Sequence, residues 1–297
     1  MSSSTVQLDT PAPLSIKTVA VIGAGQMGGG IAQVLASSGF DTLLYDASSA
    51  GLNKGMKAIY ARLTRQIEKG TLTAEARTDI ISRLKSVTAL EELKSADLVI
   101  EAIIENEPIK LELFAKLDAE CQPSCILATN TSSISITKIA AATKRPTQVV
   151  GMHFMNPVPV MKLVELIRGL QTSDETYETA KALTLKLEKT PVTANHDYPG
   201  FIVNRILLPM INEAIFALME GIASPEDIDT AMKLGTNQPM GPLTLADFIG
   251  LDTCLAITQI LHRELGDDKF RPCPLLVKYV EAGWHGKKSG RGFYKYE

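Results

Sequence analysis

The sequence predicts an α/β fold with two parts: a doubly wound parallel sheet followed by a smaller, all-helical C-terminal domain. Three observations predict it. Short apolar segments alternate with helical stretches over the first two thirds of the chain, as in a parallel sheet covered by helices. A glycine-rich turn directly follows the first apolar segment. From about residue 200 onward only helical periodicities remain, and they are interrupted at Ser224-Pro225, Gly241-Pro242 and Arg271-Pro272.

The expected elements follow in chain order. Residues 17–22 form a β-branched strand, and residues 26–38 form a helix that Gly39 closes. A second strand over 41–45 precedes a long helix over 50–69. The further strands are expected at 98–103, 126–129, 149–153 and 163–167. These elements predict a polar leader over 1–15, a dinucleotide-binding domain over 16–196 and a helical domain over 197–297.

Composition narrows the function classes. The 297 residues carry 30 basic and 33 acidic side chains, a net charge of −3. So balanced a charge gives no strong positive electrostatic potential that would attract nucleic acid or a membrane surface. No apolar run reaches the ~18 residues that a membrane span needs. The four cysteines lack the paired spacing of a zinc site, so we expect no metal, free thiols and a reducing compartment. Neither end of the chain resembles a targeting signal, which favours the cytoplasm.

The glycine-rich turn has the GxGxxG spacing, Gly23-Ala24-Gly25-Gln26-Met27-Gly28, between a strand and a helix. In a Rossmann-like domain, Gly23 allows the tight turn, Gly25 lets a pyrophosphate approach the backbone and Gly28 lets the helix pack on the strand. Gln26 and Met27 open the helix whose N-terminus faces the anion. Asp46 ends the second strand, where a carboxylate binds the adenosine ribose and repels a 2′-phosphate. The motif therefore predicts NAD in preference to NADP.

A second group of residues has the pattern of an acid–base site. His153 lies near the carboxyl end of one apolar strand, and Glu165 lies inside the next. A carboxylate among so many apolar neighbours needs a partner, and a histidine beside it would serve as a general base whose tautomer the glutamate holds. Ser132 follows a third strand and would either contact a substrate oxygen or cap a helix; the sequence leaves both open. The other histidines, His196, His262 and His285, have no such context.

These residues stand in segments that resemble the 3-hydroxyacyl-CoA dehydrogenase family over nearly the whole chain, from about Ile16 to Tyr296. The segments are VIGAGQMGGGIAQ, ATNTSS, HFMNPVPVMKLVE, PGFIVNRILLPM, DTAMKLGTNQPMGPLTLADFIGLD and GKKSGRGFYKY. The resemblance implies NAD-dependent oxidation of the 3-hydroxyl of an acyl-coenzyme A thioester, and a homodimer formed through the helical domain.

The resemblance also implies individual roles. It makes His153 the base, Glu165 its supporting carboxylate, and Ser132 and Asn204 the contacts to substrate. On the coenzyme, it places Asp46 on the adenosine ribose. Contacts on the nicotinamide side are implied for Glu105, Lys110, Asn156 and Lys288.

A basic helix face is a candidate binding site for the phosphates of coenzyme A. In the long helix, Leu52, Met56, Ile59, Leu63 and Ile67 form an apolar stripe. The cationic residues on the other side are Lys54, Lys57, Arg62 and Arg65. They would either bind the phosphates of coenzyme A or form an ordinary solvated face. The positions nearest to the family's contacts in this helix are Ile59 and Gln66, which differ from the family's serine and lysine.

The sequence also leaves two other classes of function open. One is a related hydroxyacid dehydrogenase, of the gulonate type, which shares the histidine–glutamate arrangement, or of the 3-hydroxyisobutyrate type, which normally uses a lysine. The other is a non-catalytic NAD-binding protein on the same scaffold, against which the combination of His153, Glu165 and Asn204 argues. Acyl chain length and the physiological direction of the reaction are not encoded in a recognisable pattern.

Overall fold

The computed structural model describes residues 15–297, and the chain divides after Asp197 into two compact units. We call residues up to Asp197 the N-terminal unit and residues from Tyr198 the C-terminal unit. Apart from Ser15, the predicted polar leader lies outside the described residues.

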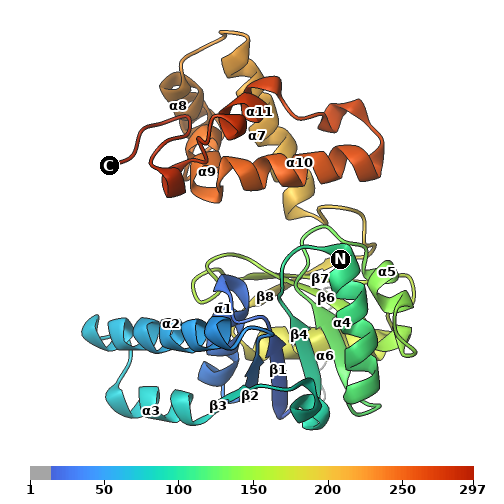
Figure 1. Cartoon of the computed structure of the whole chain (residues 1–297). Helices are drawn as coiled ribbons and strands as arrows, with labels where there is room; N and C mark the ends of the chain where they lie inside the picture. The colour runs from blue at the N-terminus through green and yellow to red at the C-terminus, as the bar shows by residue number, and fades with distance from the viewer. Residues whose placement is uncertain (1–14) are drawn as a thin grey trace, which may run out of the picture. The chain divides into compact units, whose positions relative to one another are not determined.

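The N-terminal unit contains one eight-stranded sheet with the order β3-β2-β1-β4-β5-β6-β7-β8 (Figure 1). Its strands are β1 (Thr18–Ile22), β2 (Asp41–Tyr45), β3 (Leu84–Val87), β4 (Leu98–Glu101), β5 (Ile126–Thr129), β6 (Val149–Phe154), β7 (Leu163–Ile167) and β8 (Thr190–Ala194). The order around β1 and β4 is that of a doubly wound sheet, which confirms the predicted fold class. A ligand is expected at the carboxyl ends of strands where the winding reverses, here between β1 and β4.

The structure corrects the prediction of a wholly parallel sheet at one pair. Strand β7 runs antiparallel to β6, because residues 155–162 form only a loop and a parallel crossover needs a longer connection. Two strands were not predicted. Strand β3 has polar residues at its centre, and β8 carries Pro191 and alternates in exposure, as an edge strand does.

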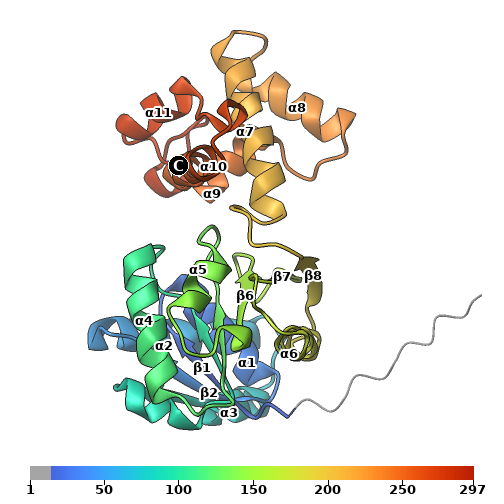
Figure 2. The same ribbon diagram turned by 90° about the vertical axis from the view of Figure 1, so that its right-hand side faces the viewer.

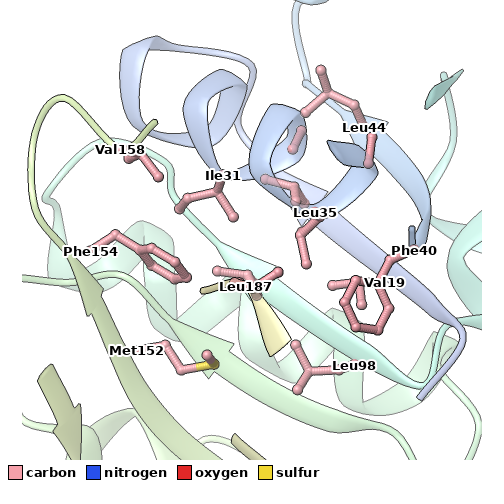
Figure 3. Packing of buried hydrophobic residues seen from close by; sticks show 14 of the residues in the cluster. Val19, Ile31, Leu35, Phe40, Leu44, Leu98, Met152, Phe154, Val158 and Leu187 are labelled. Carbon is pink, nitrogen blue, oxygen red and sulfur yellow. The ribbon is translucent and has the colours of Figure 1, made fainter. Parts of the chain in front are cut away.

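Helices cover both faces of the sheet (Figure 2). They are α1 (Gln26–Ser37), α2 (Ser49–Glu68), α3 (Ala74–Ser82), α4 (Glu107–Glu120), α5 (Ile136–Ala141) and α6 (Asp174–Lys186). Helices α1, α2 and α6 share one hydrophobic core with the sheet. In Figure 3, Ile31 and Leu35 of α1 lie over this core together with Phe154 and Leu187. Because this core joins α1 to β6, it holds the glycine-rich turn and the predicted base in one rigid body.

The C-terminal unit is helical, as predicted. It comprises α7 (Val203–Met219), α8 (Pro225–Gly235), α9 (Pro242–Ile249), α10 (Leu251–Leu265) and α11 (Pro274–Glu281), which enclose a second core. Over residues 15–297, no single helix is both long and apolar enough to cross a membrane. The pair α9 and α10, bent by 98°, meets that test of length and composition when taken together.

Candidate active site

The glycine-rich turn has the geometry that its spacing predicts. Gly23 has φ +98°, and a β-carbon there would lie 2.6 Å from the carbonyl oxygen of Ala102. A β-carbon on Gly28 would overlap the carbonyl oxygen of Gly23, so α1 approaches β1 as closely as glycine allows. Helix α1 begins with Gly25 as N-cap, without a side-chain cap and without an acidic residue in its first turn. This N-terminus therefore suits an external anion.

A cavity of about 630 Å³ lies at this turn. Gly23, Gly25, Gln26, Met27 and Asp46 all line it, together with apolar side chains from the ends of β1 and β4. Oδ2 of Asp46 accepts a hydrogen bond of 2.8 Å from the backbone N–H of Ala24, and Oδ1 accepts one of 2.9 Å from that of Ser48. These bonds hold the carboxylate beside the turn. The open helix terminus, the apolar walls and the fixed carboxylate fit the pyrophosphate, adenine and ribose of a dinucleotide.

Glu105 organises the loop that carries Ser132. Its Oε1 accepts hydrogen bonds from Thr131 Oγ1 at 2.6 Å, from the backbone N–H of Ser132 at 2.9 Å and from Ser133 Oγ at 3.0 Å. Ser132 Oγ lies 3.2 Å from the same oxygen. Burial by itself would raise the pKa of Glu105, but the charge of Lys110 and these hydrogen bonds lower it below the usual value for glutamate. Glu105 is thus an ionised group that shapes the serine loop.

Lys110 lies in the interior of the N-terminal unit. Its Nζ donates to Glu101 Oε1 at 2.5 Å and lies 3.4 Å from Glu105 Oε2, and both Lys110 and Glu101 are fully buried. Thr129 Oγ1 donates to the other oxygen of Glu101 at 2.7 Å. Sequence reasoning missed Glu101, although it ends the apolar strand β4 in the same way that Glu165 interrupts β7. The same signal, a carboxylate in an apolar strand, would have found it.

His153 and Glu165 face each other across β6 and β7. They are direct partners in the antiparallel register, and His153 Nδ1 lies 2.7 Å from Glu165 Oε2. Glu165 is 0% exposed and His153 8%. Asn130, which sequence reasoning did not single out, accepts a hydrogen bond of 2.8 Å from the backbone N–H of Phe154 and fastens the end of β6. The pair is therefore held in a buried and hydrogen-bonded position at the edge of the sheet where the dinucleotide turn also lies.

Asn156 connects the glycine-rich turn with the segment that follows β6. Gln26 Nε2 at the start of α1 donates to Asn156 Oδ1, two residues after β6, at 2.9 Å. The contact joins the start of α1 to the loop that follows β6, the strand that carries His153. This contact joins residues predicted from two separate motifs within the N-terminal unit.

Two predicted residues belong to the C-terminal unit. Asn204 lies in the first turn of α7 and is partly buried. Lys288 lies in a short 3₁₀ helix, Lys287–Ser289, and its Nζ donates to Asp252 Oδ2 at 2.7 Å.

The basic face predicted on α2 is only partly present. Lys54, Lys57 and Arg65 are exposed, but Arg62 is not a member of this face. Its guanidinium donates to Gln33 Oε1 at 2.6 Å and to the carbonyl oxygen of Gly29 at 2.9 Å, so it joins α2 to α1. Burial lowers its pKa. Arg62, predicted as part of the cationic face, instead contacts α1 because α2 turns this edge toward that helix, and phosphate binding by Lys54, Lys57 and Arg65 stays a prediction.

Within residues 15–297, no three His, Cys, Asp or Glu side chains are grouped so that they could hold a metal ion. All four cysteines are buried free thiols.

Known proteins resemble this chain over nearly its whole length. Residues 18–198 match the family model "3-hydroxyacyl-CoA dehydrogenase, NAD binding domain", and residues 200–296 match "3-hydroxyacyl-CoA dehydrogenase, C-terminal domain". A protein of Bradyrhizobium diazoefficiens named 3-hydroxybutyryl-CoA dehydrogenase is 58% identical, over 95% of this chain and 96% of its own. A protein of the same name from Clostridioides difficile is 49% identical, over 94% and 99% of the two chains. The crystal structure of (S)-3-hydroxybutyryl-CoA dehydrogenase PaaH1 from Ralstonia eutropha has a TM-score of 0.92 and 50% identity, covering 95% of this chain and 100% of that one.

Proposed function

The chain belongs to the 3-hydroxyacyl-CoA dehydrogenase family, and from that premise we propose that it oxidises (S)-3-hydroxyacyl-CoA to 3-oxoacyl-CoA with NAD, and catalyses the reverse reduction. The observation that carries the proposal is the buried pair of His153 and Glu165 at the edge of the sheet where the dinucleotide turn lies. A reduction of acetoacetyl-CoA to 3-hydroxybutyryl-CoA is the simplest example, since relatives with this name share about half of the residues or more.

His153 acts as the general acid and base. Because Glu165 engages Nδ1, Nε2 is the ring nitrogen that takes the hydroxyl proton during oxidation and returns it during reduction. The carboxylate of Glu165 holds the ring and stabilises the imidazolium that forms. Bound NAD supplies the acceptor for the hydride that leaves the 3-carbon. Ser132 and Asn204 contact the substrate oxygen in this proposal, and Glu105 positions Ser132.

The coenzyme is held by residues of the N-terminal unit. The start of α1 at Gly25, Gln26 and Met27 faces the pyrophosphate, while Asp46 binds the adenosine ribose and disfavours a 2′-phosphate. Glu105 and Asn156 belong to the nicotinamide side. Lys110 contributes there through Glu105 in this proposal, because its own side chain is fully buried.

We assign residues 16–196 to coenzyme binding and residues 197–297 to substrate binding and to a homodimer. In the C-terminal unit, large apolar side chains are exposed at Ile206 (67%), Ile222 (72%) and Leu234 (81%), and a groove of about 730 Å³ runs along α7. In this proposal these side chains lie at the subunit interface, since large exposed apolar patches mark interaction surfaces. Light scattering should give twice the 32.1 kDa chain mass, and Ile206→Glu should shift the mass toward that of the monomer.

We also propose that the protein works in the cytoplasm. Four buried free thiols are consistent with a reducing compartment, where disulfides are rare.

A steady-state assay of the purified protein tests the function. It uses acetoacetyl-CoA and longer 3-oxoacyl-CoA substrates with NADH and with NADPH, and L-gulonate with NAD in the reverse direction. We expect rapid oxidation of NADH with acetoacetyl-CoA and little turnover of L-gulonate. Turnover of L-gulonate without turnover of any thioester would replace the proposal by the gulonate type. NADH binding without turnover of either substrate would leave a non-catalytic NAD-binding protein.

A further inference from the structure

A closed ring of polar contacts joins the ends of β4 and β5 to the first turn of α4. Lys110 Nζ donates to Glu101 Oε1 at 2.5 Å and lies 3.4 Å from Glu105 Oε2. On the other side, Thr129 Oγ1 donates to Glu101 Oε2 at 2.7 Å and accepts the backbone N–H of Thr131 at 3.1 Å. Thr131 Oγ1 donates to Glu105 Oε1 at 2.6 Å, which closes the ring. We call these five residues the polar ring.

Thr129 has a fixed part in the polar ring. Its hydroxyl lies between a carboxylate, which only accepts, and a backbone N–H, which only donates, so it must donate to Glu101 and accept from Thr131. Thr129 and Glu101 are 0% exposed, and Thr131 is 1% exposed. Loss of the hydroxyl would therefore remove the partners of a buried carboxylate oxygen and a buried N–H together, which costs more than losing a bond at the surface.

The polar ring leads from the interior to the loop that carries Ser132. Thr131 Oγ1 accepts the backbone N–H groups of Ser133 at 3.4 Å and Ile134 at 3.0 Å. Glu105 Oε1 accepts the backbone N–H of Ser132 at 2.9 Å, and Ser132 Oγ lies 3.2 Å from the same oxygen. The side chain of Glu105 is 33% exposed, whereas the other members of the ring are buried. The ring thus fastens a partly exposed loop to two buried strands.

We propose that Thr129 is a positioning residue for the reaction, and that its hydroxyl holds the serine loop, residues 130–134, so that Ser132 contacts the substrate oxygen. The inference rests on the proposed function for the role of Ser132. Thr129 acts through the loop, because its own side chain is fully buried. A contact to substrate is effective only when it is held within about 0.5 Å of the productive geometry, and the polar ring supplies that support.

Kinetics of three variants test the proposal. Thr129→Val keeps the shape of the side chain and removes the hydroxyl, whereas Thr129→Ser keeps the hydroxyl. Thr184→Val is the matched control, because Thr184 is an equally buried threonine whose hydroxyl donates to the carbonyl oxygen of Ala180 in α6 at 2.8 Å. With acetoacetyl-CoA and NADH, kcat of Thr129→Val should fall about tenfold, the scale of one hydrogen bond to a charged group. Affinity for NADH should be unchanged, and Thr129→Ser and Thr184→Val should turn over like the parent.

A double-variant cycle separates positioning from general support of the fold. If Thr129 acts through Ser132, Thr129→Val should lower kcat no further in a Ser132→Ala protein. Losses that multiply would overturn the proposal, as would a Thr129→Val protein that turns over like the parent. Equal losses of kcat in Thr129→Val and Thr184→Val would also overturn it, because any buried hydroxyl would then have the same effect.

Amide hydrogen exchange of the serine loop gives a readout that does not need turnover. Peptides covering residues 130–134 should exchange about tenfold faster in Thr129→Val than in the parent, Thr129→Ser and Thr184→Val, while peptides of β6 exchange equally in all four proteins. Equal exchange of the serine loop in all four would overturn the proposal. If the loop exchanges faster in Thr129→Val but the parent reduces no thioester, the proposed function fails, and the anchoring of the serine loop by Thr129 stands.

Discussion

Replacing Glu165 by Gln removes one charge from the candidate active site while keeping the size of the side chain. Glu165 is fully buried and its Oε2 lies 2.7 Å from His153 Nδ1. In the proposed mechanism, His153 becomes a cation as the substrate hydroxyl loses its proton. The carboxylate stabilises that cation, whereas the amide of Gln cannot. The variant should therefore bind NADH and substrate normally but oxidise 3-hydroxybutyryl-CoA slowly.

The geometry sets the size of this effect. With the two charge centres about 4 Å apart and an effective dielectric constant of about 20, their attraction is about 4 kcal/mol. Because about 1.4 kcal/mol corresponds to a factor of ten, full loss of the attraction would lower kcat about a thousandfold. His153→Gln should lower kcat roughly 10²–10⁴-fold, the usual scale for a general acid–base group. The two losses should not multiply in the double variant, because the residues act as one unit.

The measurement is the single-turnover rate of each single variant and of the double variant at saturating coenzyme. NADH titration and thermal unfolding of the same proteins serve as controls for coenzyme binding and folding. A Glu165→Gln protein that turns over as fast as the parent would show that the pair is structural. Losses that multiply in the double variant would show that His153 and Glu165 act independently and that the proposed pairing is wrong.

Four further predictions follow from individual residues. Asp46→Ser should reduce the preference for NADH over NADPH, because a charge clash with the 2′-phosphate disappears, and equal use of both coenzymes by the parent would contradict the role of Asp46. Asn204→Ala should lower kcat while leaving NADH affinity nearly unchanged in titrations; loss of NADH binding would place Asn204 outside the substrate site. Lys110→Met leaves the fully buried Glu101 without its cation and should lower the free energy of unfolding in urea by about 3–5 kcal/mol, a loss that added Glu101→Gln should partly reverse. Because the pKa of Glu105 is lowered in the fold, its ionised form stabilises the protein above the usual glutamate pKa, and this stability should vanish as pH falls through the lowered value. Glu105→Gln should remove that part of the acid dependence in unfolding curves.

Local sequence patterns were sufficient for the dinucleotide turn. Gly23, Gly25 and Gly28 stand within six residues. A β-carbon on Gly23 would meet the carbonyl oxygen of Ala102 and one on Gly28 would meet that of Gly23, whereas the space beside Gly25 is open. The role of Asp46 was predicted in the same way, from its position at the end of the next strand along the chain. Such features are predictable because the geometry of one βαβ unit is nearly constant between proteins.

Contacts between segments that are far apart in the sequence were harder to predict. The pairing of His153 with Glu165 could be inferred from charge in an apolar strand, but its register depends on β7 running antiparallel to β6, which the predicted parallel sheet did not contain. The buried pairing of Lys110 depends on Glu101, nine residues earlier at the end of β4, which the signal that indicated Glu165 would also have found.

The sequence by itself therefore determined the fold class, the coenzyme turn and the residue types of an acid–base pair, because these depend on local spacing and on the cost of burying a lone charge. Tertiary structure alone decided that Arg62 joins α2 to α1, and that Lys162, Lys186 and Lys189 line one cavity beside the C-terminal end of α1. Those three lysines come from two sides of the β7–β8 crossover. Their proximity arises from the pairing of strands, and the long-range hydrogen bonds and packing that set this pairing leave no pattern in a short stretch of sequence.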